Sequence, residues 1–269
     1  MGKRNVKKIV LIVGGSFLVL LALVAFFAPR FIVYYQAKKV TTQLGPAAEW
    51  MTEYDLTFAE TEPVQKVSFD GMTVLIPGNF RERETALETC RVYDGPVEKD
   101  EGRRENVLMT TGDVSDLNRS IDEMKSVLVD KKSGIFRNYI AKRLSKEMKE
   151  LSQENPNYYS LAKSCYLLTE KDYSFWNLEK GIAYLIKGTL KTGITPYCDY
   201  ILIYEKEDVC GLIYVTDRSL YTELSSSSPN YSLQVELYGM DDFSTSHFLL
   251  IKCDTLETAY AIINSAEIE

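Results

Sequence analysis

Few residues in this sequence could perform chemistry. His247 is the single histidine, so it is the only imidazole available as a general base, and a zinc site built from several histidines is excluded. It stands at the start of a predicted strand, where we expect it to form hydrogen bonds with neighbouring residues. The sequence contains no Gly-x-Ser-x-Gly, Walker, Gly-x-Gly-x-x-Gly or calcium-loop motif. We therefore predict no catalytic, cofactor-binding or metal-binding residue, and no cofactor.

Two short fragments imitate the signatures of penicillin-recognising serine enzymes. Ser160-Leu161-Ala162-Lys163 matches Ser-x-x-Lys, and Lys191-Thr192-Gly193 matches Lys-Thr-Gly. In those enzymes Lys-Thr-Gly lies on a strand that faces the serine nucleophile, and a Ser-Asp-Asn motif completes the site. Here only a short segment separates the two fragments, Ser-Asp-Asn is absent, and Lys-Thr-Gly has the sequence context of a helix end. We interpret both fragments as chance matches.

The cysteines have no Cys-x-x-Cys pair and no metal-ligand spacing. There are five, at positions 90, 165, 198, 210 and 253, and an odd number is unusual in an oxidising compartment. If Tyr204 pairs with Val209 in a hairpin, Cys198 and Cys210 lie on opposite faces of the sheet, too far apart for a disulfide. We expect buried free thiols, and an inverted membrane topology is the alternative explanation.

Aromatic residues are concentrated between positions 158 and 184. Core packing is their expected role, and a ligand pocket or a partner surface is the alternative. The residues concerned are Tyr158, Tyr159, Tyr166, Tyr173, Phe175, Trp176 and Tyr184.

The element that positions the rest of the chain is an apolar segment near its start. Ile9–Phe27 is nineteen residues long without a charge. As a helix it reaches about 28 Å, close to the ~30 Å hydrocarbon core of a bilayer. We predict a transmembrane helix whose partner is the lipid bilayer, and aromatic residues follow it as an interfacial belt. No small-residue cleavage site follows the apolar run, so an uncleaved anchor is favoured over a signal peptide.

Charge predicts the orientation of that helix. Lys3, Arg4, Lys7 and Lys8 precede it, and the positive-inside rule places this end in the cytoplasm, with the C-terminal domain outside the plasma membrane. Residues 1–39 hold seven bases and no acid, whereas residues 40–269 hold 24 bases against 38 acids, a net charge of −14. Such a domain is repelled by phosphate backbones, so we predict no nucleic-acid partner.

The charge and hydropathy patterns divide the chain into four parts. Residues 1–8 form a cytoplasmic basic tail, 9–27 the transmembrane helix, 28–60 a juxtamembrane helix or linker, and 61–269 an extracytoplasmic α+β domain. Gly45-Pro46 interrupts the helix-compatible juxtamembrane segment.

Strands open and close the predicted domain, and helices fill its middle. Asp70-Gly71 favours a two-residue type I′ hairpin turn within 66–76 that pairs Phe69 with Met72 and Val67 with Val74. Further strands are predicted at 88–93, 106–111, 200–204, 209–215, 231–238 and 246–252. Helices are predicted from 115 or 116 to 130, from 134 to about 151, over 158–168, from 174 to 193, and after a capping box at 254–257.

These elements predict the α+β class, with an antiparallel sheet packed between helices in an α/β/α sandwich-like arrangement. The strands at 200–204 and 209–215 are apolar on both faces, which indicates that the sheet is covered from both sides. Phe69-Asp-Gly-Met-Thr-Val-Leu-Ile-Pro-Gly-Asn-Phe80 resembles the first hairpin of PsbP-like domains, and Ile262-Ile-Asn-Ser-Ala-Glu-Ile268 is similar to their closing helix. The resemblance implies an α/β/α sandwich used mostly as a non-catalytic assembly or binding module, and no functional residue transfers from it.

The leading hypothesis is a single-pass membrane-anchored protein whose extracytoplasmic domain binds a protein partner and is not an enzyme. The first alternative is a membrane-tethered hydrolase or transferase with a carboxylate- or serine-based site that forms no sequence motif. The second alternative is a cytoplasm-facing module that senses a small ligand.

Overall fold

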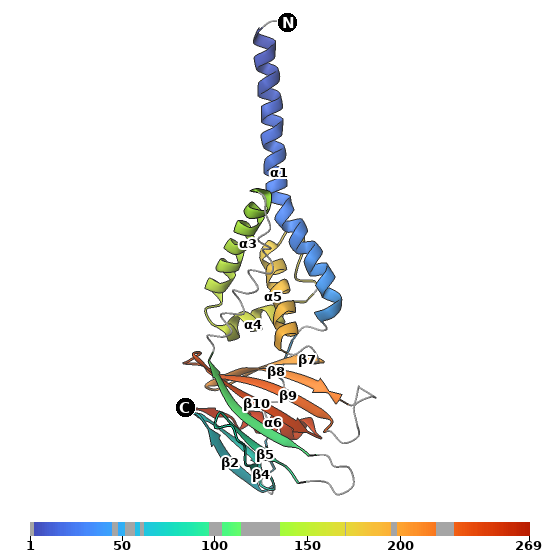
Figure 1. The fold of residues 1–269 in the computed structure, drawn as a ribbon. Helices are drawn as coiled ribbons and strands as arrows, with labels where there is room; N and C mark the ends of the chain where they lie inside the picture. The colour runs from blue at the N-terminus through green and yellow to red at the C-terminus, as the bar shows by residue number, and fades with distance from the viewer. Residues whose placement is uncertain are drawn as a thin grey trace.

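The computed structural model describes residues 3–44, 48–51, 57–59, 62–96, 104–113, 135–169, 171–194, 198–218 and 229–269. They form three layers below a protruding helix, as Figure 1 shows. Helices lie above a large sheet, and one helix and a small sheet lie beneath it. This arrangement confirms the predicted α+β class with a sheet packed between helices. The helix predicted from 115 or 116 to 130 lies outside the described residues.

The first helix, α1 (Lys3–Leu44), has two halves with different surroundings. Every side chain from Ile12 to Val24 is exposed, whereas Val33 and Ala37 are 2% and 0% exposed. Pro29 lies inside α1, and proline bends a helix because it removes one backbone hydrogen bond. α1 bends where it meets the helical layer (Figure 1). The helical part of the predicted juxtamembrane segment is therefore packed into the domain.

The large sheet has the strand order β1-β7-β8-β9-β10-β6-β5-β4, and its pairs are antiparallel except for β1 with β7. Segments distant in sequence therefore pair directly, as β10 does with β6. The strands are β1 (Glu49–Trp50), β4 (Arg81–Arg83), β5 (Cys90–Asp94), β6 (Asn106–Asp113), β7 (Tyr200–Lys206), β8 (Val209–Asp217), β9 (Tyr231–Gly239) and β10 (Thr245–Cys253).

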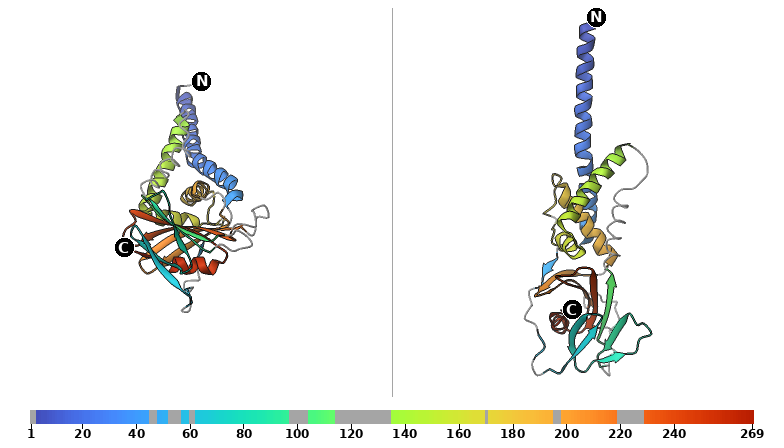
Figure 2. Two further views of the ribbon diagram at one scale, coloured as in Figure 1. Left: turned by 60° about the horizontal axis from the view of Figure 1, so that its bottom comes forward. Right: turned by 90° about the vertical axis from the view of Figure 1, so that its left-hand side faces the viewer.

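A small sheet of order β11-β3-β2 and helix α6 cover the lower face of the large sheet. Its strands and the helix are β2 (Val64–Phe69), β3 (Met72–Pro77), β11 (Glu267–Ile268) and α6 (Leu256–Asn264). The predicted hairpin is confirmed, because Phe69 pairs with Met72 and Val67 with Val74. Asp70 and Gly71 have φ values of +46° and +79°, as a type I′ turn requires. Figure 2 shows α6 beneath the sheet.

The upper layer consists of the lower half of α1 with α3 (Ile135–Glu154), α4 (Tyr158–Tyr166) and α5 (Leu178–Ile194). All three predicted helices are present with shifted ends. α4 starts where Asn157 accepts a hydrogen bond from the Ser160 backbone N–H. α5 starts at Leu178 rather than at residue 174, because the Asn177 side chain accepts from the Lys180 N–H and begins the helix there.

Two hydrophobic cores fill the space on either side of the large sheet. The upper core joins Val33 of α1 to Ile182 of α5 and Leu212 of β8. The lower core joins Val74 of β3 and Ile263 of α6 to the opposite face of the sheet. Strands β7 and β8 contribute to both cores, which confirms that they are covered on both sides.

The predicted register of the β7–β8 hairpin is wrong. Lys206, rather than Tyr204, pairs with Val209, so the turn has two residues instead of four. The charged residues Glu205 and Lys206 extend the strand because their side chains find partners elsewhere. Glu205 Oε1 lies 2.6 Å from Lys163 Nζ, and Lys206 Nζ donates to the Asn264 carbonyl.

The predicted separation of Cys198 and Cys210 on opposite faces is also wrong. Both belong to the upper core, because Cys198 lies before β7 and the alternation of strand faces does not apply to it. All five cysteines are buried free thiols.

The predicted start of α6 is also corrected. Its N-cap is Thr255 rather than Asp254, and the Asp254 carboxylate accepts a hydrogen bond from the Asn230 N–H instead.

Candidate functional site

An acidic pocket is the candidate binding site of the domain. Its volume is about 480 Å³, and it lies between the β2–β3 turn, the segment between β9 and β10, and the last residues of the chain. The side chains of Asp70, Asp208, Asp241, Asp242 and Glu269 line it. No lysine or arginine is among the described residues that line this pocket, so its charge is negative and complements a cationic group.

His247 lines the same pocket and is only 5% exposed. Its Nδ1 is buried and has no hydrogen-bond partner among the described residues. Burial lowers the pKa of His247, and the nearby Asp70 carboxylate opposes that shift. The expected hydrogen bonds to neighbouring residues are therefore not made at Nδ1. A neutral imidazole also leaves the negative charge of the pocket uncompensated.

Two of the carboxylates are held by neighbouring groups. Thr111 Oγ1 donates to Asp70 Oδ2 at 2.6 Å. The Ser244 backbone N–H and hydroxyl donate to Asp242 at 2.8 and 3.0 Å, and these bonds lower the pKa of Asp242. Within the described residues no three His, Cys, Asp or Glu side chains are placed to hold a metal ion. The acidic lining complements the positive charge of an ammonium or guanidinium group.

The structure places the serine-enzyme fragments in ordinary structural roles. The Ser160 hydroxyl donates to the Asn157 carbonyl at 3.0 Å, and Lys163 pairs with Glu205. Residues 191–193 lie on α5, so Lys-Thr-Gly is part of a helix, as predicted, and not of a strand.

A buried acid under the helical layer was not recognised from the sequence. Glu236 of β9 is 4% exposed and faces the helical layer. Its neighbours are two tyrosines of the sheet, Tyr214 and Tyr238, and two tyrosines of α4, Tyr158 and Tyr166. Tyr238 donates to Glu236 Oε2 at 3.3 Å. The buried hydroxyls of Tyr158, Tyr166 and Tyr214 have no hydrogen-bond partner of normal geometry among the described residues. Burial raises the pKa of Glu236 to about 7, so the carboxyl holds its proton in weakly acidic solution.

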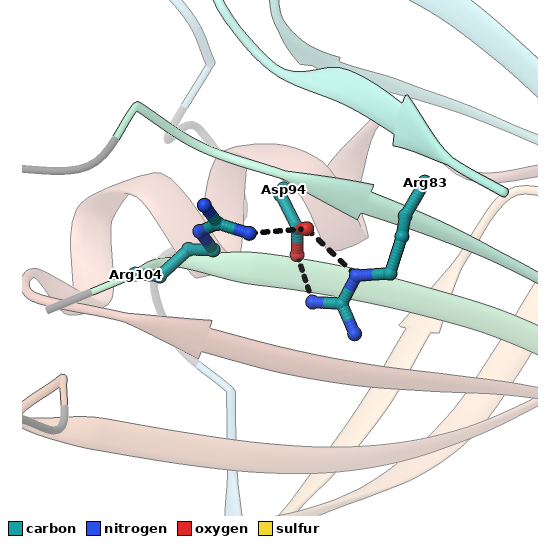
Figure 3. A network of polar contacts seen from close by, with 3 residues as sticks. All are labelled: Arg83, Asp94 and Arg104. Atoms are coloured by element: carbon teal, nitrogen blue, oxygen red, sulfur yellow. Dashed lines mark hydrogen bonds and ion pairs between the residues drawn. The ribbon is translucent and has the colours of Figure 1, made fainter. Parts of the chain in front are cut away.

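An ion-pair network joins β4, the edge strand of the large sheet, to its neighbour β5. Arg83 of β4 makes a bidentate contact with Asp94 of β5, and Arg104 Nη1 lies 3.0 Å from the same carboxylate (Figure 3). The Arg83 guanidinium holds the pKa of Asp94 below its usual range. The network joins the ends of β4 and β5 to Arg104, which precedes the start of β6. Both arginine side chains are about half exposed, so they remain partly in contact with solvent.

Most of the aromatic run packs in the core, as expected. Tyr158, Tyr159, Tyr166 and Tyr184 are at most 4% exposed. Trp176 differs, because it is 67% exposed on the segment between α4 and α5.

Among the described residues, one helix is long and apolar enough to cross a membrane. It is the Ile12–Lys38 part of α1, in which an 18-residue stretch has a mean hydropathy of 2.4. By length and composition it is compatible with membrane anchoring.

No family model and no curated protein matches the chain. Among solved structures, the chain is similar to the Ran-binding protein Mog1p of Saccharomyces cerevisiae. The TM-score is 0.30 and the sequence identity 9%, over 77% of this chain and 96% of that chain. A TM-score this low supports no conclusion about function, and the resemblance to PsbP-like domains stays a prediction.

Proposed function

We propose that this chain is a single-pass membrane-anchored protein whose α+β domain lies outside the cytoplasm and binds a protein partner. The division of α1 supports the proposal. Its first half exposes apolar side chains from Ile12 to Phe27, with nothing in the described residues to cover most of them, while its second half is built into the upper core. A lipid bilayer is the solvent that suits the first half.

The orientation rests on charge. Four bases precede the apolar run, and the positive-inside rule places them in the cytoplasm. Arg30 follows the run but bonds locally, because its Nη1 donates to the Phe26 carbonyl and its guanidinium lies 3.8 Å from the Phe26 ring centre. The domain then lies at the outer surface of the plasma membrane.

The acidic pocket is the proposed contact point for the partner. A protruding lysine or arginine of the partner would meet Asp70, Asp208 and the Asp241–Asp242 pair. The buried, unpaired Nδ1 of His247 would be a further acceptor after a small rearrangement. Charge attraction of this kind speeds association and selects partners.

Two alternatives use the same structure. A membrane-tethered hydrolase or transferase is the first, and the carboxylates and the imidazole that line the His247 pocket would form its site. A cytoplasm-facing sensor would require the reverse orientation of α1. His247→Ala tests the enzyme hypothesis, and Ser160→Ala is its control. If His247→Ala abolished a measured catalytic activity without unfolding the domain, the result would contradict the binding hypothesis.

Topology mapping tests the main proposal. A reporter fused after Glu269 should be active on the outer side, and the full-length chain should remain in the membrane fraction after alkaline washing. Protease added to wall-stripped cells should digest the domain. An intact chain in the soluble fraction, or a domain protected from the protease, would contradict the proposal.

A further inference from the structure

An aromatic cluster joins the α4–α5 segment to α1 at the end of its apolar run. The Phe175 ring stacks on Phe27 with 5.9 Å between ring centres, and Trp176 meets Phe27 edge-on at 6.0 Å. Phe175 and Trp176 also contact each other at 5.2 Å. Tyr34, two turns further along α1, contacts Phe175 at 6.2 Å. The segment 171–177 is therefore fixed against α1 at these two levels.

This cluster is open to its surroundings. Trp176 is 67% exposed, and on α1 Phe26 and Phe31 are 46% and 64% exposed. Tryptophan and phenylalanine rings exposed together on a water-facing surface are costly, because each ring buries a large apolar area when it is covered. Such a patch indicates a covering partner.

The level of the cluster along α1 identifies that partner. The uncharged run ends at Phe27, and burial in the domain begins with Ala28 and Pro29. Arg30, the first charge after the run, points back to the Phe26 carbonyl. If α1 spans the bilayer, the boundary between hydrocarbon and headgroups falls at Phe26–Arg30. Trp176 touches Phe27, so it lies at the same depth.

We propose that the α4–α5 segment 171–177 is a second membrane contact, which places Trp176 in the headgroup region of the bilayer that α1 spans. The inference rests on the proposed membrane anchor. Tryptophan prefers this region because its ring is apolar and its indole N–H remains able to donate a hydrogen bond. Two contacts, α1 and Trp176, prevent the domain from swinging about the helix and hold the helical layer against the membrane.

The chain contains only two tryptophans, which makes a sharp test possible. Trp50→Phe leaves Trp176 as the single indole, and Trp176→Phe leaves Trp50. Trp50 lies on β1 beside Lys163, in the sheet, and serves as the matched control. Trp176 lies beside the start of the lower half of α1, and Trp50 follows its end in the chain. That half, residues 29–44, is roughly 24 Å long as a helix, so the two tryptophans lie at different distances from the proposed membrane surface.

Each full-length variant is reconstituted into phosphatidylcholine–phosphatidylglycerol vesicles with and without lipid brominated near the headgroup end of its acyl chains. We expect Trp176 fluorescence to be blue-shifted and quenched at least twofold more than Trp50 fluorescence. Vesicle flotation reports separately on the anchor. Flotation with equal, weak quenching of both tryptophans would overturn the second contact and leave the anchor intact. Failure to float would overturn both, and near-ultraviolet circular dichroism checks that each variant is folded.

Discussion

Glu236 shows how burial alone changes the chemistry of one residue. Its carboxyl lies among tyrosines, and burial raises its pKa from 4.5 to about 7. A raised pKa in the folded state stabilises the protein below the unfolded pKa, and that stabilisation is lost as the pH rises through about 7. A Glu236 variant that cannot ionise should therefore not lose this stability as the pH rises.

Glu236→Gln should abolish the decrease in unfolding free energy between pH 4.5 and pH 7. Glu236 alone contributes about 3 kcal/mol to this decrease in the wild type, because each pKa unit corresponds to about 1.4 kcal/mol. Denaturant unfolding of the detergent-solubilised chain across this pH range measures it. Glu88→Gln, at an exposed position, is the control and should keep the wild-type slope. An unchanged slope in Glu236→Gln would contradict the assignment.

His247 offers a direct measurement, because the chain has one histidine and therefore one set of imidazole proton resonances. Its titration midpoint should lie below 6.5, since burial lowers the pKa of His247. Asp70→Asn should lower the midpoint further, because the Asp70 carboxylate raises that pKa. Asp172→Asn, on the α4–α5 segment, should leave it unchanged. A midpoint above 6.5 would show that the imidazole is not buried as described.

At the scale of elements, the contact between α1 and α5 decides whether the apolar helix and the domain form one rigid body. Gly181 of α5 faces Val33 of α1 so closely that an added Cβ would lie 2.7 Å from Val33 Cγ1. Glycine is unfavourable inside a helix, so its presence here reflects the close approach of the two helices.

Gly181→Ala should destabilise the domain by about 1–3 kcal/mol through overpacking, although alanine is the better helix former. Val33→Ala combined with Gly181→Ala should recover part of that loss by making room for the new methyl group. Thermal unfolding of the full chain in detergent measures both. Gly14→Ala, where nothing lies within 4 Å of the new Cβ, is the control. A stabilising effect of Gly181→Ala alone would show that the helices are further apart.

Local sequence predicted the elements well where a short motif controls them. Asp70-Gly71 set the hairpin register, because only a two-residue turn with positive φ at both positions fits it. The β7–β8 register was missed by two residues, because Glu205 and Lys206 resemble turn residues locally. They continue the strand because distant residues, Lys163 and Asn264, bind their side chains.

For the whole molecule, the membrane proposal predicts a fixed geometry. α1 and the α4–α5 segment would hold the helical layer at the bilayer. The acidic pocket lies at the β2–β3 turn and at the segment between β9 and β10, where Asp70 and Asp241 line it. A partner would then approach from solvent and not from the lipid. The topology, tryptophan and His247 experiments test successive parts of this arrangement.

The sequence by itself determined the apolar span, the α+β class and the acidic character of the domain, because these depend on composition and on residues close together in the chain. The tertiary structure decided which polar residues meet. In β9, Ser232, Gln234 and Glu236 alternate with apolar residues and resemble a solvent-facing row, yet the helical layer covers Glu236 and shifts its pKa. The pocket likewise combines carboxylates from turns far apart in sequence. Such groupings depend on strand order and layer packing, which local patterns do not encode.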